Sequence, residues 1–121
     1  MSMGRKKLYS DEDTLGKLLT TFYKTGFGGT SITDLTEATG LLRGSLYSTF
    51  GSKLGMFLET LKYSITKSDD KTLKLVIIAT LELASYNDEV KKLVIDYMKT
   101  NKINQEMLGI EILKIGKIIG D

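Results

Sequence analysis

The stretch Thr30–Lys53, TSITDLTEATGLLRGSLYSTFGSK, predicts two short helices separated by a glycine turn. Ser31 opens a capping box in which an aspartate replaces the more common glutamate, and this favours a helix over residues 32–39. Gly40 is expected to end that helix, because glycine takes the left-handed conformation of a tight turn at little cost. A second helix is expected over residues 43–50. Two short helices joined by such a turn are typical of a helix-turn-helix unit.

A longer helix is expected before this unit. Residues 11–24 carry apolar side chains three and four positions apart, which predicts a helix with one apolar face. Ser10 is expected to cap its start and Gly26 to end it. The side chains expected to join the two shorter helices to this apolar face are Ile32, Leu35, Leu41, Leu46 and Phe50.

The side chains left outward on the helix expected over residues 43–50 are small or polar. They are Arg43, Gly44, Ser45, Ser48 and Thr49, with Tyr47 at the flank. Small side chains let a helix approach base edges in a DNA major groove, where Arg43 can pair with guanine or with a phosphate. The residues suited to phosphate oxygens are Ser31, Thr33, Tyr47 and Lys53. Helix-glycine-helix units also occur in domains that bind no DNA, so this pattern alone leaves both interpretations open.

The rest of the chain also predicts helices, so the expected fold class is all-α. A connector helix begins at Lys53, and the polar residues 64–71 follow as a loop or hinge. An apolar helix is expected over residues 71–85. Its expected stripe is Leu73, Val76, Ile77, Thr80, Leu81 and Ala84. Asn87 or Asp88 is expected to cap the next helix. Its expected apolar face is Val90, Leu93, Val94, Tyr97 and Met98.

The last helix is expected over residues 102–120 and carries a wide stripe rich in isoleucine. Either it packs on the core of its own chain, or it is buried against a second copy, since a wide apolar patch promotes association. Gly109, Gly116 and Gly120 argue against one rigid helix.

The composition of the 121-residue chain excludes several kinds of site. It contains no cysteine and no histidine, which rules out disulfides and thiolate zinc sites and removes the commonest general base near neutral pH. The carboxylates show no paired arrangement, so we expect no enzyme, no metal and no cofactor. The longest strictly apolar run, residues 75–79, falls far short of the roughly 20 residues that span a bilayer. No signal-peptide core follows the N-terminus, so a cytoplasmic protein without membrane contact is expected.

The small positive charge lies in the first half of the chain. Residues 1–53 hold seven Lys and Arg against five Asp and Glu, whereas residues 54–121 hold ten of each. The excess begins with Arg5, Lys6 and Lys7. This distribution suits an anionic partner of the first half, and a solvated basic end is the alternative.

Several segments together match a known family. They are GR (4–5), FYKTGF (22–27), TSITDL (30–35), ATG (38–40), RGSLYSTFGSK (43–53) and Phe57. With them, residues 4–63 closely resemble the N-terminal DNA-binding domain of the TetR (tetracycline-repressor-like) family. The resemblance implies that Tyr47 and Lys53 contact phosphates, with Ser31 and Thr33 near the DNA backbone. It places the remaining polar residues of the third helix near the bases: Arg43, Ser45, Ser48 and Thr49.

The resemblance also implies an organisation and a function. Residues 1–52 would form a three-helix DNA-binding domain, and residues 53–121 a connector helix with a C-terminal helical domain for dimerisation or regulation. The protein would be a homodimeric repressor on a palindromic operator in double-stranded DNA, with a small-molecule effector as a further option. The residues that would line an effector pocket, or else form ordinary core, are Met56, Tyr63, Tyr86, Tyr97 and Met98.

The second half departs from the family. Its members usually have a longer C-terminal domain, which puts an enclosed pocket and the usual dimer face in question. The hypothesis that follows is that the isoleucine-rich last helix substitutes as the dimer seam. The alternative function is a shortened member that acts through protein–protein contacts, as a heterodimer or as a helical dimer that does not bind DNA.

Overall fold

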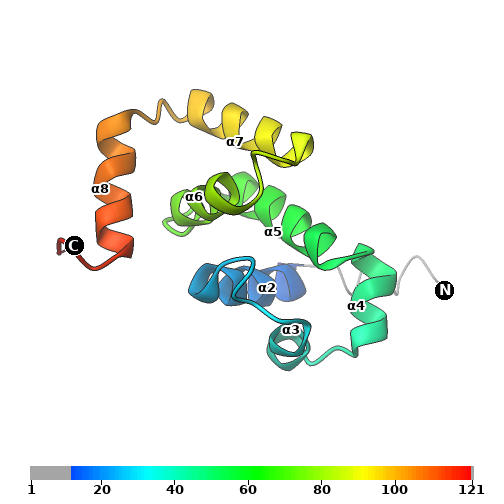
Figure 1. Ribbon diagram of the computed structural model, residues 1–121. Coiled ribbons are helices and arrows are strands. Elements are labelled where there is room, and N and C mark those ends of the chain that lie inside the picture. The colour runs from blue at the N-terminus through cyan, green and yellow to red at the C-terminus, as the bar shows by residue number, and fades with distance from the viewer. Residues whose placement is uncertain (1–11, 121) are drawn as a thin grey trace.

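The computed structural model describes residues 12–120, which form seven helices and no strand. The helices are α2 (Glu12–Thr25), α3 (Ile32–Thr39), α4 (Arg43–Phe50), α5 (Lys53–Lys67), α6 (Thr72–Glu82), α7 (Asp88–Thr100) and α8 (Gln105–Ile115). Figure 1 shows α2, α5 and α6 in the middle of the molecule, with α4 and α8 at opposite ends. The described part of the chain is therefore all-α, as the sequence predicts.

Among these described helices, none combines the length and the apolar character that a bilayer crossing would need. Two expectations lie outside the described residues, namely the cap by Ser10 and the basic cluster formed by Arg5, Lys6 and Lys7.

The helix-turn-helix unit begins and ends where its caps predict. Ser31 Oγ accepts the backbone N–H of Asp34 at 3.0 Å, and the Asp34 carboxylate accepts the N–H of Ser31 at 2.9 Å. Gly40 ends α3 with a φ of 74°, and Gly26 follows α2 with a φ of 79°. The expected spans of α3 and α4 are confirmed residue by residue.

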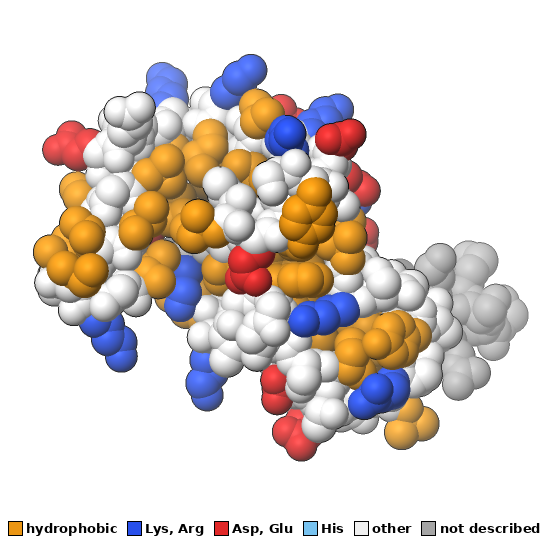
Figure 2. Space-filling view, viewed as in Figure 1, with side chains coloured by type: hydrophobic (Ala, Val, Ile, Leu, Met, Phe, Trp, Pro, Cys, Tyr) orange, Lys and Arg blue, Asp and Glu red, His pale blue; other side chains and the backbone are white. Residues whose placement is uncertain are grey.

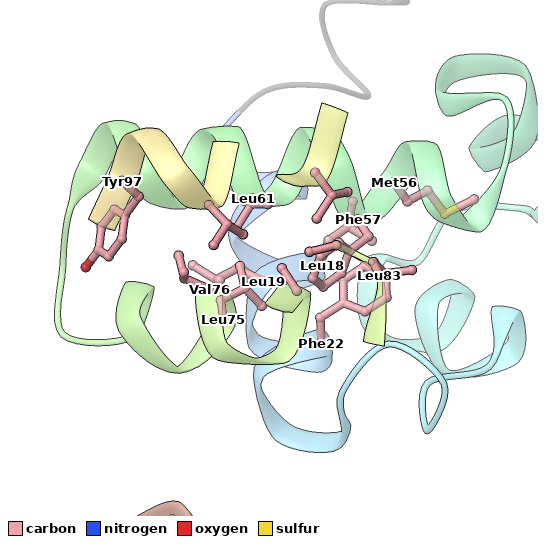
Figure 3. Packing of buried hydrophobic residues seen from close by; sticks show 14 of the residues in the cluster. Leu18, Leu19, Phe22, Met56, Phe57, Leu61, Leu75, Val76, Leu83 and Tyr97 are labelled. Carbon is pink, nitrogen blue, oxygen red and sulfur yellow. The ribbon is translucent and has the colours of Figure 1, made fainter. Parts of the chain in front are cut away.

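The core around which the first helices assemble lies between α2 and α5. Leu18 and Phe22 of α2 meet Phe57 and Leu61 of α5, and all four side chains are fully buried (Figure 3). The rings of Phe22 and Phe57 meet edge to face with centroids 5.1 Å apart. All five residues expected to join the shorter helices to this core do so: Leu35 and Leu46 are buried, and Ile32, Leu41 and Phe50 are partly buried.

The start of α5 carries a cap that the sequence analysis did not identify. Ser52 Oγ accepts the N–H of Gly55 at 2.9 Å and begins the helix at Lys53. The connector helix therefore starts immediately after α4, since only Gly51 and Ser52 separate the two.

The polar segment 64–71 is a loop only in its second half. α5 continues to Lys67, and Ser68 ends it in the left-handed conformation with a φ of 53°. Ser64 is fully buried, and its hydroxyl lies 2.9 Å from Thr72 Oγ1 at the start of α6. Thr72 Oγ1 in turn donates to the Ser64 carbonyl at 2.9 Å. The segment thus ties α5 to α6 through paired hydroxyls, which is how small polar groups are tolerated in a core.

The expected stripe of α6 is partly wrong. Leu81 is 74% exposed and Thr80 is exposed, whereas Leu75 and Ala79 are fully buried. α6 contacts α2, α5, α7 and α8. A helix with neighbours on several sides is apolar nearly all round, so the spacing of its apolar residues does not select the buried face.

α7 follows the expectation closely. The N–H of Val90 donates to Asn87 Oδ1 at 2.9 Å, so Asn87 rather than Asp88 is the cap. The buried residues of the helix are Val90, Val94 and Tyr97. Leu93 and Met98 are partly buried against the same core.

α8 is shorter than expected and none of its residues is buried. It runs from Gln105 to Ile115 with Asn104 as its cap, and it packs mainly against α6. The large apolar residues exposed on it and just after it are Met107, Ile110, Ile112, Leu113, Ile115, Ile118 and Ile119. Figure 2 shows apolar side chains gathered over this end of the molecule. Packing of the last helix into the core of its own chain is therefore not found.

Candidate nucleic-acid interface

The outer surface of α4 presents small and polar side chains on a firmly held helix. Arg43, Gly44, Tyr47 and Ser48 are exposed, and Tyr47 keeps 39% of its surface accessible. These residues are one, three, four or five positions apart and lie on one side of a short helix. Leu46, on the other side, is 1% exposed and anchors α4 in the core. The face is therefore anchored to the core through Leu46 and open to a partner.

Ser45 and Thr49 are less exposed than the sequence pattern predicts. Both are half-buried, next to Leu46 and Phe50 on the side of α4 that meets α3 and α5. A helix of two turns has room for one narrow outward face, and these two residues lie at its edges. Ser45 and Thr49 therefore lie beside the exposed residues of α4 and are not among them.

The N-terminus of α4 carries a feature that the sequence analysis passed over. Leu42 is the N-cap residue, its side chain makes no capping hydrogen bond, and it is 78% exposed. No acidic residue lies in the first turn of α4. The helix therefore presents its positive dipole end, beside Arg43, without an anionic side chain to offset it.

Lys53, the first residue of α5, is held beside this face by an aromatic ring. Its Nζ lies 4.5 Å from the centroid of the Phe27 ring, and the side chain is half-buried. Phe27 in turn packs edge to face on Phe57, with centroids 5.5 Å apart. A cation over an aromatic face is attracted to the electron density of the ring, so the direction of the ammonium group is restricted.

The start of α3 supplies the other expected backbone contacts. Ser31 and Thr33 are both exposed. The Ser31 hydroxyl oxygen accepts the capping bond from the backbone N–H of Asp34. The backbone and side-chain hydrogen bonds from Ser31, followed by the charge of Lys53, hold the pKa of Asp34 below its usual value. Asp34 therefore stays ionised, which maintains the cap on which the position of Ser31 depends.

The candidate effector residues do not come together. Met56 is buried in the core, whereas Tyr86 is 71% exposed. Only Tyr97 among the five lines one of the described cavities, a hollow of about 310 Å³ between α5 and α7 with Ile65 and Leu93 in its wall. Within residues 12–120, no three acidic side chains gather where they could share a metal ion.

Comparison with known proteins assigns the first part of the chain. Residues 18–60 match the family described as bacterial regulatory proteins, tetR family. A stretch of 60 residues, 50% of this chain, is 38% identical to YezE, an uncharacterized HTH-type transcriptional regulator of Bacillus subtilis (strain 168), and covers 31% of it. A stretch of 56 residues, 46% of this chain, is 39% identical to the HTH-type transcriptional repressor ComR of Escherichia coli (strain K12), and covers 27% of it. No solved structure matches the chain.

The matched residues contain the whole candidate interface. They begin within α2, end within α5 and include both α3 and α4. The matched stretches span less than a third of either relative. Regulators of this family are not enzymes. Residues 18–60, from within α2 to within α5, thus have the sequence of a helix-turn-helix domain of the tetR family of bacterial regulatory proteins.

Proposed function

We propose that this chain is a sequence-specific DNA-binding regulator of transcription and acts as a homodimeric repressor. The observation that carries the proposal is the exposed row of Arg43, Gly44, Tyr47 and Ser48 on α4 of a tetR-type domain. α4 enters the major groove, where short side chains allow close approach to the base edges.

The exposed residues divide into two roles. Arg43 pairs with a guanine edge, and Gly44 and Ser48 let the helix lie close to the bases, with Ser45 and Thr49 at the margins. Tyr47, Lys53, Ser31 and Thr33 donate to phosphate oxygens and fix the register of the domain on the duplex.

Dimerisation through the C-terminal helices is part of the proposal. α8 exposes apolar side chains on several sides and packs mainly against α6, which favours a second copy as its cover. Two copies related by a two-fold axis read a palindromic operator, with half-sites about 34 Å apart or a multiple of that distance. Repression follows from occupying promoter DNA in the cytoplasm, and the name of ComR as a transcriptional repressor supports this direction of regulation.

An effector would act by binding the dimer in a form whose two DNA-binding domains do not fit the operator. Such a ligand must bind the two forms with different affinity. The hollow beside Tyr97 is the place to search for it.

Action through protein contacts alone is the second candidate, and the apolar surface of α8 favours it. A heterodimer with a related regulator, or a helical dimer that does not bind DNA, would use that surface. Under this alternative the purified chain binds no DNA by itself.

Selection of bound sequences from a random DNA pool tests the proposal. The purified full chain should enrich a palindromic site, which would report DNA binding, sequence preference and two-fold symmetry together. Enrichment of a single asymmetric half-site would contradict the homodimer. The absence of any retained DNA at low ionic strength would contradict DNA binding altogether.

A further inference from the structure

Glu82, at the end of α6, holds the loop between α2 and α3. Its Oε1 accepts the backbone N–H of Gly28 at 2.8 Å, and its Oε2 accepts the N–H of Phe27 at 3.2 Å. The contact joins residues more than 50 positions apart in the sequence. A carboxylate that accepts two backbone N–H groups makes charge-assisted bonds, which are stronger than bonds between neutral groups.

The loop is shaped to receive this carboxylate. A Cβ added to Gly26 would lie 2.8 Å from Glu82 Oε2, and one added to Gly28 would lie 3.1 Å from Oε1. The first separation is shorter than real Cβ contacts, and the second is tighter than most of them. Gly26 also has a φ of 79°, which a residue with a side chain rarely adopts. The two glycines therefore leave the space that the Glu82 side chain occupies.

Phe27, in the same loop, supports Lys53. Glu82 fixes the backbone of Phe27, and the Phe27 ring carries the Lys53 ammonium at 4.5 Å from its centroid. The Phe27 ring also packs against the rings of Phe57 and Phe22, and the centroids of Phe27 and Phe22 lie 6.3 Å apart. A continuous set of contacts thus runs from α6 to a side chain at the DNA-facing surface.

We propose that Glu82 is a positioning residue for DNA binding, which acts through Phe27 to hold the Lys53 ammonium where it meets a phosphate. This inference rests on the proposed function. Without the carboxylate, the loop loses two hydrogen bonds and the long Lys53 side chain regains rotamers that must be frozen again on binding. The binding surface of the domain is therefore completed by an element outside the helix-turn-helix unit.

A double-mutant cycle tests the inference on the full chain. Affinity for the selected operator is measured for the wild type, Glu82→Ala, Lys53→Met and the double variant. Glu82→Ala should weaken binding about threefold to tenfold, comparable with the loss of one phosphate contact. In the Lys53→Met background the same change should alter affinity less than about twofold, since coupled residues are not additive. Equal losses in both backgrounds would overturn the inference, because they indicate a general structural effect.

Two further variants serve as controls. Glu82→Gln keeps one side-chain oxygen as an acceptor for the loop, so it should retain most of the operator affinity. It replaces Glu82→Ala in the comparison if that variant folds poorly. Glu59→Ala removes an equal charge from α5, where the carboxylate contacts Lys62 and not the loop, and should not weaken binding. Loss of affinity in Glu59→Ala as large as in Glu82→Ala would contradict a specific role for the loop contact.

A measurement without DNA separates this inference from the proposed function. The Phe27 ring should shift the NMR signals of the Lys53 side-chain methylenes upfield, and Glu82→Ala should reduce that shift. If the wild type binds no DNA, the proposed function fails, and the DNA role of Glu82 fails with it. If the wild type binds DNA and the Lys53 signals are unchanged in Glu82→Ala, only the role of Glu82 fails.

Discussion

At the residue scale, Gly44 shows a conflict between stability and binding. Glycine disfavours a helix, yet Gly44 lies in the first turn of α4, and a Cβ there would meet nothing within 4 Å. Gly44→Ala should therefore stabilise the fold by up to about 1 kcal/mol. The added methyl stands on the surface proposed to face DNA, so operator affinity should fall. Urea unfolding and DNA titration of the same variant measure both effects.

Gly16→Ala is the matched control for this prediction. Gly16 lies in α2, and a Cβ there also meets nothing within 4 Å. The substitution should stabilise the fold in the same way and leave operator affinity unchanged. If Gly44→Ala binds DNA as well as Gly16→Ala does, close approach of the α4 backbone is not part of recognition.

Arg43 and Lys53 should give different signatures at this same scale. Arg43→Ala should relax base preference at one operator position, at a cost of about 1 to 3 kcal/mol. Lys53→Ala should weaken binding to all sequences alike. It should also reduce the slope of log affinity against log salt concentration by about one, because one counterion fewer is released. Titrations of operator and random DNA at several salt concentrations separate the two. Equal losses on both DNAs for Arg43→Ala would show that it contacts only phosphate.

The sequence predicts the exposure of some side chains well and that of others poorly. The outward face of α4 is confirmed for Arg43, Gly44 and Ser48, because Leu46 defines the inward side of a short helix. The burial of Ser45 and the exposure of Leu42 depend on how closely α3 and α5 approach, which the spacing of apolar residues does not encode. The contact between Glu82 and the loop was missed because it joins distant parts of the chain.

At the element scale, the capping box of α3 should make stability depend on pH. The pKa of Asp34 is lowered from 3.8 by its bonds with Ser31, so its ionised form stabilises the folded state above pH 3.8. That stabilisation should disappear as the pH falls through the lowered pKa. Asp34→Asn should remove this part of the pH dependence, and Ser31→Ala should cost about 1 kcal/mol near neutral pH.

Urea unfolding between pH 2 and pH 7 measures both variants against the wild type. The difference between the wild type and Asp34→Asn should be largest near neutral pH and should shrink below about pH 4, where the carboxylate becomes protonated. A constant difference over this range would mean that the charge of Asp34 does not contribute through the cap.

The junction of α5 and α6 supplies a second prediction for elements. Ser64 and Thr72 are fully buried, and their hydroxyls lie 2.9 Å apart. Removal of the Thr72 hydroxyl takes this partner from Ser64, whereas the Thr72 hydroxyl keeps its bond to the Ser64 carbonyl when the Ser64 hydroxyl is removed. Thr72→Val should lower the free energy of unfolding by about 1 to 3 kcal/mol, because it leaves a buried polar group unpaired. Replacing both, as Ser64→Ala with Thr72→Val, should cost less than the sum of the single changes. Additive costs in urea unfolding would show that the two hydroxyls are not coupled.

Helix boundaries were predictable where caps mark them, as at Ser31, Gly40 and Asn87. The face of α6 was not, because four neighbouring helices make nearly all of its sides suitable for apolar residues. The segment after Ser64 looked like a loop because the sequence pattern does not show that its hydroxyl is paired and buried.

At the scale of the whole molecule, the first and second halves differ in how much of the structure their sequences predict. One buried core runs from Leu18 to Tyr97, and local caps with apolar spacing predict best the helices that residues 12–61 contribute to it. The position of α8 depends on what covers its apolar sides, which no local pattern specifies. The division into residues 1–52 and 53–121 stays a prediction, and the core includes residues from both sides of it.

Association through α8 is the prediction that belongs to this scale. Ile110→Lys combined with Ile112→Lys places charge on different sides of α8, at residues 43% and 47% exposed. Because both side chains are already accessible, the fold should tolerate the change while the dimer dissociates.

Tyr86→Lys is the control, since Tyr86 is 71% exposed but precedes α7, at the end of that helix away from α8. Sedimentation equilibrium at micromolar concentration should show a dimer for the wild type and Tyr86→Lys, and a monomer for the α8 variant. The monomer should still fold. It should bind the operator more weakly, because a single DNA-binding domain reads only one half-site. A wild type that is monomeric at that concentration would exclude α8 as the dimer seam.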